Sequence, residues 1–226
     1  MLLSERELHV WAVPLDDTTA DSAVLATAER ARAERFRCPT ARATFIQART
    51  ALRRLLGDYL DMPPQAVVLS RDRHGKPRLG AGMGALQFNV SHSGRLALIA
   101  LSRAAVGIDL EWRKVDFAWR ELVPICCHPA EEAEFHDATD AGGRERLLRL
   151  WTAKEAYLKG RGEGLGLPLT AVRLQASAAG WRPRTEAPWD DGQGWWLHSL
   201  PLPTGYLGCL ATPFPSPLIR FRPWRR

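Results

Sequence analysis

The stretch LWTAKEAYLKGRGEGLGLPL, from Leu150 to Leu169, begins as a helix and ends in closely spaced glycines. Glu155 and Lys159 are four positions apart, so they share one face of that helix, and Lys154 lies one step round from Glu155. The glycines outnumber what a helix cap requires, and they free the backbone for the close approach of a ligand or a second chain. The stretch is therefore either a solvated surface helix with a loose end or one wall of an active site.

The whole chain has the composition of a folded protein. Its 226 residues are 46 % hydrophobic and 25 % charged, which predicts one large domain or two small ones. The first residues turn charged after three positions, and no apolar run is long enough to cross a bilayer. We therefore expect a cytoplasmic protein with no signal peptide and with reduced cysteines. The net charge of +6 and the pI of about 9.5 suit an acidic or phosphate-rich partner.

Lysine is rare in this chain. Among 31 basic residues only Lys76, Lys114, Lys154 and Lys159 are lysines, and the rest are arginines. A lysine here is less readily explained as random surface charge, which makes Lys76, Lys154 and Lys159 candidates for a function.

The order of the expected elements is strand, helix, helix, strands, and then the same order again. Short strands joined by turns favour antiparallel sheets over one continuous parallel sheet. We therefore predict an α+β protein with two similar subdomains, residues 1–104 and 105–226. The helices expected from apolar periodicity span 19–36, 41–60, 129–135 and 144–159, and the strands span 7–15, 66–70, 86–90, 96–102, 105–112, 171–176, 194–200 and 206–212.

The segment VGIDLEW, residues 106–112, alternates apolar residues with Asp109 and Glu111. Because side chains two apart on a strand point the same way, both carboxylates project from one face. Two like charges this close repel, and a hard cation such as magnesium would offset that repulsion. An amphipathic strand with one wet face explains the same alternation.

The segment FNVSHSG, residues 88–94, places Ser91 and His92 at an expected hairpin turn. Hydroxyls, an imidazole and exposed turn amides suit an anion site, although a merely polar turn would use the same residues. Other chemistries have less support, because the sequence has no HExxH, no paired zinc ligands, no GxSxG, no Walker loop and no recognised nucleic-acid-binding motif. The adjacent Cys126 and Cys127 are expected in the core.

Four motifs, in this order and at this spacing, resemble the 4'-phosphopantetheinyl transferases of the surfactin-synthetase-activating type. They are GKP at 75–77, FNVSHSG at 88–94, GIDLE at 107–111 and WTAKEAYLKGRGEGL at 151–165. Each motif alone is weak, whereas the ordered combination is specific, and the WxxKEA wording is that of one large subgroup. The resemblance implies a pseudodimer of two α/β halves, each with a small mainly antiparallel sheet and packed helices, and with coenzyme A in the cleft between them.

The resemblance also implies an activity. Such enzymes move the phosphopantetheine arm of coenzyme A onto a serine of an apo carrier protein and release adenosine 3',5'-bisphosphate. Asp109, Glu111 and Glu155 would hold magnesium, or manganese in its place, on the diphosphate. Glu155 would take the serine proton directly or through a water, with Asp109 and Lys159 completing the catalytic set. Glu131, or its neighbour Glu132, matches a further acidic position and is the alternative base.

The other residues implied by the resemblance would bind coenzyme A: Ser91 and His92 at the diphosphate, Lys154 and Lys159 against phosphate charge, Lys76 and Pro77 near the adenine and the 3'-phosphate, and Arg42 and Arg49 as candidates for that phosphate. The expected protein partner is an acidic carrier, and neither nucleic acid nor a membrane is expected. Because one chain holds both halves, we expect it to work as a monomer. The alternative function is a coenzyme A-binding protein without transferase activity.

Overall fold

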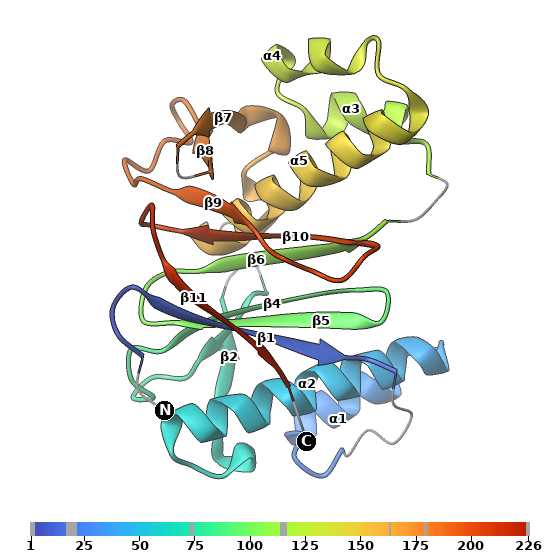
Figure 1. Cartoon of the computed structure of the whole chain (residues 1–226). Helices are drawn as coiled ribbons and strands as arrows, with labels where there is room; N and C mark the ends of the chain where they lie inside the picture. The colour runs from blue at the N-terminus through green and yellow to red at the C-terminus, as the bar shows by residue number, and fades with distance from the viewer. Residues whose placement is uncertain are drawn as a thin grey trace.

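Two β-sheets pack with their inner faces together, and helices cover their outer faces (Figure 1). The computed structural model describes residues 3–16, 22–72, 75–113, 117–162, 164–178 and 180–224. One sheet has the strand order β11-β1-β5-β4, the other has the order β6-β10-β9-β8-β7, and β2 pairs with β3 in a separate ribbon. The predicted α+β class with mainly antiparallel sheets is confirmed.

The elements of the first half have these bounds: β1 Glu7–Pro14, α1 Thr27–Glu34, α2 Pro39–Leu60, η1 Pro64–Ala66, β2 Leu69–Arg71, β3 Pro77–Leu79, β4 Gln87–Ser93 and β5 Leu96–Ser102. The remaining elements are β6 Gly107–Trp112, α3 Trp119–Cys126, α4 Pro129–Glu132, η2 Ala133–Phe135, α5 Asp140–Arg161, η3 Gly164–Gly166, η4 Leu169–Ala171, β7 Arg173–Ser177, β8 Gly180–Arg184, β9 Trp196–Ser199, β10 Tyr206–Thr212 and β11 Leu218–Pro223. No helix in the described ranges is long and apolar enough to cross a membrane.

Helix α2 covers the outer face of the first sheet, as its apolar periodicity predicts. Leu52, Leu55 and Leu56 are almost fully buried and pack against Ile99 and Leu101 of β5. The opposite face of the same sheet packs on the second sheet. There the large apolar side chains of β1 and β5 meet those of β6 and β10, so the core between the sheets holds the two halves together.

Helix α5 covers the outer face of the second sheet. It begins at Thr139, whose hydroxyl accepts a hydrogen bond from the N–H of Gly142, and it ends at Gly162, which adopts φ 76°. Helix α3, which the sequence did not predict, packs against α5 through Trp119. Cys126 at its end is buried and free, as is Cys127, so the prediction that this pair lies in the core is confirmed.

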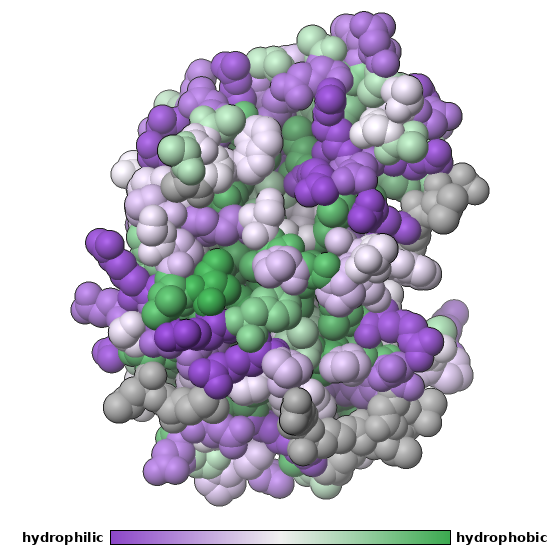
Figure 2. All heavy atoms as spheres, viewed as in Figure 1, coloured by the Kyte–Doolittle hydropathy of each residue, from purple (hydrophilic) through white to green (hydrophobic). Residues whose placement is uncertain are grey.

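The C-terminal tail, which the sequence left without a role, forms β11. This strand pairs in parallel with β1 from Glu7 opposite Leu218 to Ala12 opposite Pro223, and so joins the sheet of the other half. Figure 2 shows hydrophobic surface across the middle of the face on which β11 lies, with polar residues toward both ends. The predicted boundary between residues 104 and 105 stays a prediction.

The first helix and the predicted turn at Ser91 differ most clearly from the structure. The first helix begins at Thr27 instead of residue 19, because Val24 and Leu25 are buried in a turn and the Glu29 carboxylate accepts from the N–H of Ala26 to cap α1; residues 17–21 lie outside the described ranges. The prediction that FNVSHSG forms a turn from Ser91 onward is wrong. Ser91, His92 and Ser93 continue β4 and pair with β5, so the turn holds only Gly94 and Arg95.

Removing residues 217–226 should lower the melting temperature by about 10 °C. Ile219 and Phe221 pack on the core between the sheets and Trp224 packs on the core beneath α2. Each partly buried large side chain contributes about 1–2 kcal/mol, and 1 kcal/mol corresponds to about 2–4 °C in a protein of this size. Thermal unfolding by circular dichroism measures the shift. Removal of residues 225–226 alone is the control, and equal melting temperatures for the two truncations would contradict the role given to β11.

Candidate functional site

Helix α5 lies unusually close to β6, and that contact places the site. A Cβ built on Gly107 would lie 1.9 Å from the carbonyl oxygen of Ala156 and 2.3 Å from the backbone nitrogen of Gly160. Both opposing atoms belong to the backbone and cannot turn away, so only glycine fits position 107. The contact brings one face of the KEA helix onto the strand that carries Asp109 and Glu111.

Strand β4 meets the free edge of β6 through side chains instead of a backbone ladder. The side-chain oxygen of Asn89 accepts a hydrogen bond of 2.8 Å from the N–H of Ile108, and the Ser93 hydroxyl accepts one of 3.0 Å from the N–H of Trp112. Neither residue was predicted to belong to the junction. The signal that would have found them is the period of two in Asn89, Ser91 and Ser93, which requires FNVSHSG to be read as a strand.

Three predicted site residues from three motifs meet at this junction. Asp109 is 3 % exposed, and its Oδ1 accepts from the Ser91 hydroxyl at 2.8 Å. The ammonium of Lys159 reaches the same Oδ1 at 2.5 Å and the Ser91 oxygen at 3.2 Å. The face of β6 that carries Asp109 is therefore not exposed to solvent at this position. It is covered by α5, with a half-buried lysine as its counter-charge.

Glu155 and Glu111 lie around this centre. Burial raises the pKa of the Glu155 carboxyl, the Lys159 charge lowers it, and the negative charges of Asp109 and Glu111 raise it further. The three carboxylates therefore repel one another electrostatically. Glu111 is half-buried and accepts from the Ser93 hydroxyl at 2.9 Å.

The carboxylate oxygens of Asp109, Glu111 and Glu155 are ligands of the kind that a hard cation prefers. Asp109 Oδ2 is buried, and it has no hydrogen-bond partner among the residues that the structure describes. Carboxylate oxygens are the ligands that magnesium prefers, and a cation would satisfy this atom and offset the mutual repulsion. In the same described ranges, no three His, Cys, Asp or Glu side chains converge as closely as a complete metal site requires. Asp109, Glu111 and Glu155 fit magnesium as a partial set that other oxygen ligands would complete.

The structure places Lys154, which was predicted to neutralise a phosphate, in a buried cluster away from the junction. Its side chain is completely buried, and its ammonium donates to Glu131 Oε2 at 2.7 Å, to the carbonyl of Cys126 at 2.8 Å and to that of Leu169 at 3.0 Å. Because an ammonium has three donors, none remains for a ligand. Glu131, predicted as the alternative base, is 5 % exposed and fully engaged in the same cluster, whereas Glu132 is partly exposed.

A cavity of about 610 Å³ lies between the helices of the first half and the β2–β3 ribbon. Four arginines line it with one acid and several apolar or small residues: Arg32, Arg35, Arg49 and Arg71, then Glu29, Phe36, Leu69, Ser70, Ala28 and Pro77. Of the predicted nucleotide-binding residues, Arg49 and Pro77 belong to this lining. Arg42 is exposed on α2 outside it.

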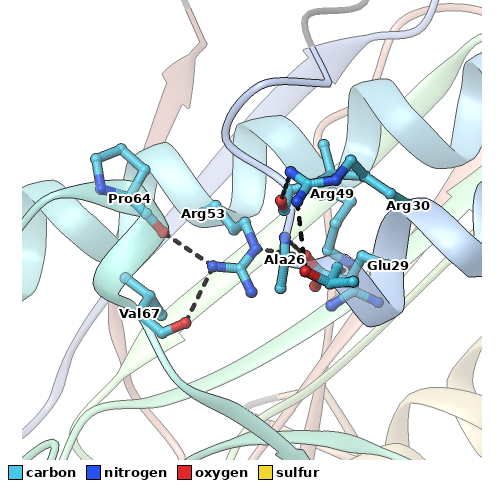
Figure 3. Close-up of polar contacts among 9 residues, drawn as sticks. Ala26, Glu29, Arg30, Arg49, Arg53, Pro64 and Val67 are labelled. Atoms are coloured by element: carbon cyan, nitrogen blue, oxygen red, sulfur yellow. Dashed lines mark hydrogen bonds and ion pairs between the residues drawn. The ribbon is translucent and has the colours of Figure 1, made fainter.

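Glu29 organises the inner wall of this arginine pocket (Figure 3). One carboxylate oxygen lies 3.5 Å from Arg49 Nε, and the other lies 2.5 Å from Nε of the buried Arg53. Arg53 also donates to the carbonyls of Pro64 and Val67, so it holds α2 to the following turn. Arg49 and Arg53 share the Glu29 carboxylate, so one acid faces four arginines in the lining and the pocket has a surplus of positive charge.

Lys76 and His92 both lie near Lys159. The Lys76 ammonium donates to the carbonyl of Lys159 in the last turn of α5, where a cation also meets the negative end of the helix dipole. Burial, with the charges of Arg78 and Lys159, lowers the pKa of Lys76 to about 8. His92 is exposed on β4, beside the buried Ser91.

Comparisons with known proteins agree along most of the chain. Residues 105–193 match the model described as the 4'-phosphopantetheinyl transferase superfamily, and residues 9–104 match the model of the 4'-phosphopantetheinyl transferase N-terminal region. The 4'-phosphopantetheinyl transferase HetI of Nostoc is 37 % identical, covering 73 % of this chain and 72 % of that protein. A putative 4'-phosphopantetheinyl transferase of Synechocystis is 32 % identical over 86 % of this chain and 80 % of its own. The Bacillus subtilis 4'-phosphopantetheinyl transferase Sfp is 29 % identical over 58 % of this chain and 61 % of its own.

Gly107→Ala should destabilise the protein by about 3 kcal/mol or more, because the new methyl group meets two backbone atoms and α5 must move away. Chemical denaturation with fluorescence detection measures the loss. Gly142→Ala, in the first turn of the same helix, is the matched control: its Cβ would meet only the Thr139 hydroxyl, at 3.0 Å. A Gly107→Ala variant as stable as Gly142→Ala would disprove the close contact.

Proposed function

The chain belongs to the 4'-phosphopantetheinyl transferase superfamily, and we propose that it performs the transfer at the junction of α5, β4 and β6 with the help of magnesium. Enzymes of this family move the phosphopantetheine arm of coenzyme A to a serine of an apo carrier protein and release adenosine 3',5'-bisphosphate. The observation that carries the placement is the meeting of Lys159, Asp109 and Ser91, one residue from each of three motifs.

Asp109, Glu111 and Glu155 would hold the magnesium. The support is chemical: an orphaned buried oxygen on Asp109 and a negative charge shared by three carboxylates. When bound, magnesium supplies positive charge to the diphosphate of coenzyme A, with which it commonly shares oxygen ligands. Manganese, which also accepts carboxylate ligands, would serve in its place.

The residues of the chain then have distinct roles in the transfer. Lys159, 30 % exposed, would exchange part of its contact with Asp109 for a phosphate oxygen and stabilise the charge that develops there. Glu155 would accept the proton of the carrier serine, directly or through a water. The serine oxygen attacks the phosphorus attached to the pantetheine arm, and the bond from that phosphorus to the bridging oxygen breaks. The electron pair leaves with adenosine 3',5'-bisphosphate.

The arginine pocket is the proposed site of the 3'-phosphate of coenzyme A. Guanidinium groups pair with phosphate oxygens in bidentate geometry, and four of them converge on one cavity. Pro77 in the lining and Lys76 next to it in the chain would contact the adenine and the 3'-phosphate, as the resemblance implies. Ser91 and His92 remain proposed contacts of the diphosphate.

The proposed partner is an acidic carrier protein. The net charge of +6 favours an acidic surface and would chiefly raise the rate of association. A coenzyme A-binding protein without transfer activity is less favoured, because its ligand would not need a base and three carboxylates beside the diphosphate. We also propose a cytoplasmic monomer.

Purified protein with coenzyme A and magnesium should add the mass of phosphopantetheine to an apo carrier protein, and a chelator should abolish the addition. Asp109→Asn should lower kcat/KM by about 100-fold or more, because it removes a charge at the centre of the site. Asp140→Asn, which changes an exposed acid in the first turn of α5, is the control and should keep full activity. Intact-mass spectrometry reads out both. A lack of transfer to several carriers that a known family enzyme modifies would refute the activity.

Arg71→Gln should raise KM for coenzyme A by about tenfold and leave KM for 3'-dephospho-coenzyme A nearly unchanged. A charge-assisted hydrogen bond contributes about 1.5–3 kcal/mol, and only the first substrate carries the 3'-phosphate. Arg42→Gln is the control, since Arg42 is a similar exposed arginine outside the pocket. Equal effects of Arg71→Gln on both substrates would place the 3'-phosphate elsewhere.

A further inference from the structure

The most deeply buried charge in the described protein lies next to the proposed base. Lys154 is 0 % exposed, and its ammonium contacts Glu131 and the carbonyl groups of Cys126 and Leu169. These three acceptors belong to the end of α3, to α4 and to η4. One side chain of α5 is thereby tied to three separate segments of the second half.

Glu131 extends the same cluster beyond the lysine. Its Oε2 also accepts from the N–H of His128 at 2.8 Å and so caps α4, while its Oε1 accepts from the N–H of Leu174 at 2.7 Å. The carboxylate therefore joins α4 to the edge strand β7. Together the two side chains fix α5 to a frame of helices and strand that contributes no group to the junction.

A buried ion pair is a weak source of stability compared with apolar packing, because both charges lose their hydration. Its strength lies in directionality, since an apolar contact tolerates sliding and rotation whereas five hydrogen bonds do not. The pair is therefore better suited to specify one position of α5 than to hold the fold together.

The helix is fixed on two sides. Toward β6, Ala156 and Gly160 touch Gly107 without room for a methyl group. Toward α3, α4 and η4, Lys154 is locked to Glu131. Glu155 follows Lys154 by one position, a turn of about 100° around the helix axis. Rotation of α5 by a fraction of that angle would move the Glu155 carboxylate by more than an ångström.

We propose that Lys154 and Glu131 act as positioning residues for the transfer reaction: their buried pair sets the rotation of α5 that directs Glu155 and Lys159 to Asp109. The inference rests on the proposed function. It assigns neither residue to the binding of coenzyme A nor to proton transfer, because neither has a free polar atom that faces the junction.

The test uses the double variant Lys154→Met/Glu131→Gln. It removes both charges and keeps the side-chain volumes, so no charge is left buried alone and the protein should fold. Its matched control is Arg149→Met/Glu145→Gln, which removes the exposed pair of 2.6 Å on the same helix. Each protein is examined by thermal unfolding, by calorimetric titration with coenzyme A, and by the rate of transfer to an apo carrier.

For the double variant we expect a cooperative unfolding transition at a lower melting temperature, because the carbonyls of Cys126 and Leu169 lose their donor, and a Kd for coenzyme A within about twofold. Its kcat should fall by about 10- to 100-fold, since a misplacement of about 1 Å costs up to that much. The control should keep all three values. Lys159→Met should instead weaken coenzyme A binding by about tenfold, through loss of a charged contact.

Two outcomes would overturn the inference. A folded double variant with unchanged kcat would make the pair a purely structural contact. A Kd for coenzyme A raised as much as in Lys159→Met would indicate that Lys154 contacts coenzyme A directly. If the unchanged protein transfers nothing, the proposed function fails and this inference fails with it, whereas an active unchanged protein isolates the test of the pair.

Discussion

Helix α5 and strand β6 meet backbone to backbone at Gly107, and the other distances at the site depend on that contact. With any side chain at position 107 the helix would stand farther away, and the Lys159 ammonium would lose its reach of 2.5 Å to Asp109. The same approach is needed at Gly160, where a Cβ would lie 2.7 Å from the Trp195 ring. Two glycines thus set the spacing at which a carboxylate, a lysine and a hydroxyl from separate motifs come together.

The junction also shows how two halves share one site without a continuous sheet. Strand β4 forms no backbone hydrogen-bond ladder with β6. Instead, the side chains of Asn89 and Ser93 accept hydrogen bonds from two N–H groups of β6. Asn89 and Ser93 of β4 thus have a structural role. Ser91, which lies between them on the same face of the strand, donates a hydrogen bond to Asp109. On the other side of the molecule, β11 returns the end of the chain to β1, so the first sheet is complete only when the whole chain has folded.

The sequence predicted what depends on local periodicity and missed what depends on distant neighbours. The stripe of α2 and the alternation around Asp109 were predictable, because burial of one face repeats along the element. Ser and Gly favour turns, which predicts a turn at Ser91 and His92, but the pairing of β4 with β5 overrides that preference. Lys154 and Lys159 look alike in the sequence. Only the packing of α3, α4 and η4 around α5 distinguishes them. It makes Lys154 a buried structural charge, whereas Lys159 stays partly exposed.

We propose that the junction of α5, β4 and β6 binds the diphosphate of coenzyme A and that the arginine pocket binds its 3'-phosphate. A crystal structure with coenzyme A and magnesium measures this directly. We expect a metal held by Asp109, Glu111 and Glu155, Lys159 on a phosphate, the 3'-phosphate among the arginines of the pocket, and Lys154 still paired with Glu131. Coenzyme A bound elsewhere, or Lys154 released from Glu131 to contact a phosphate, would contradict it.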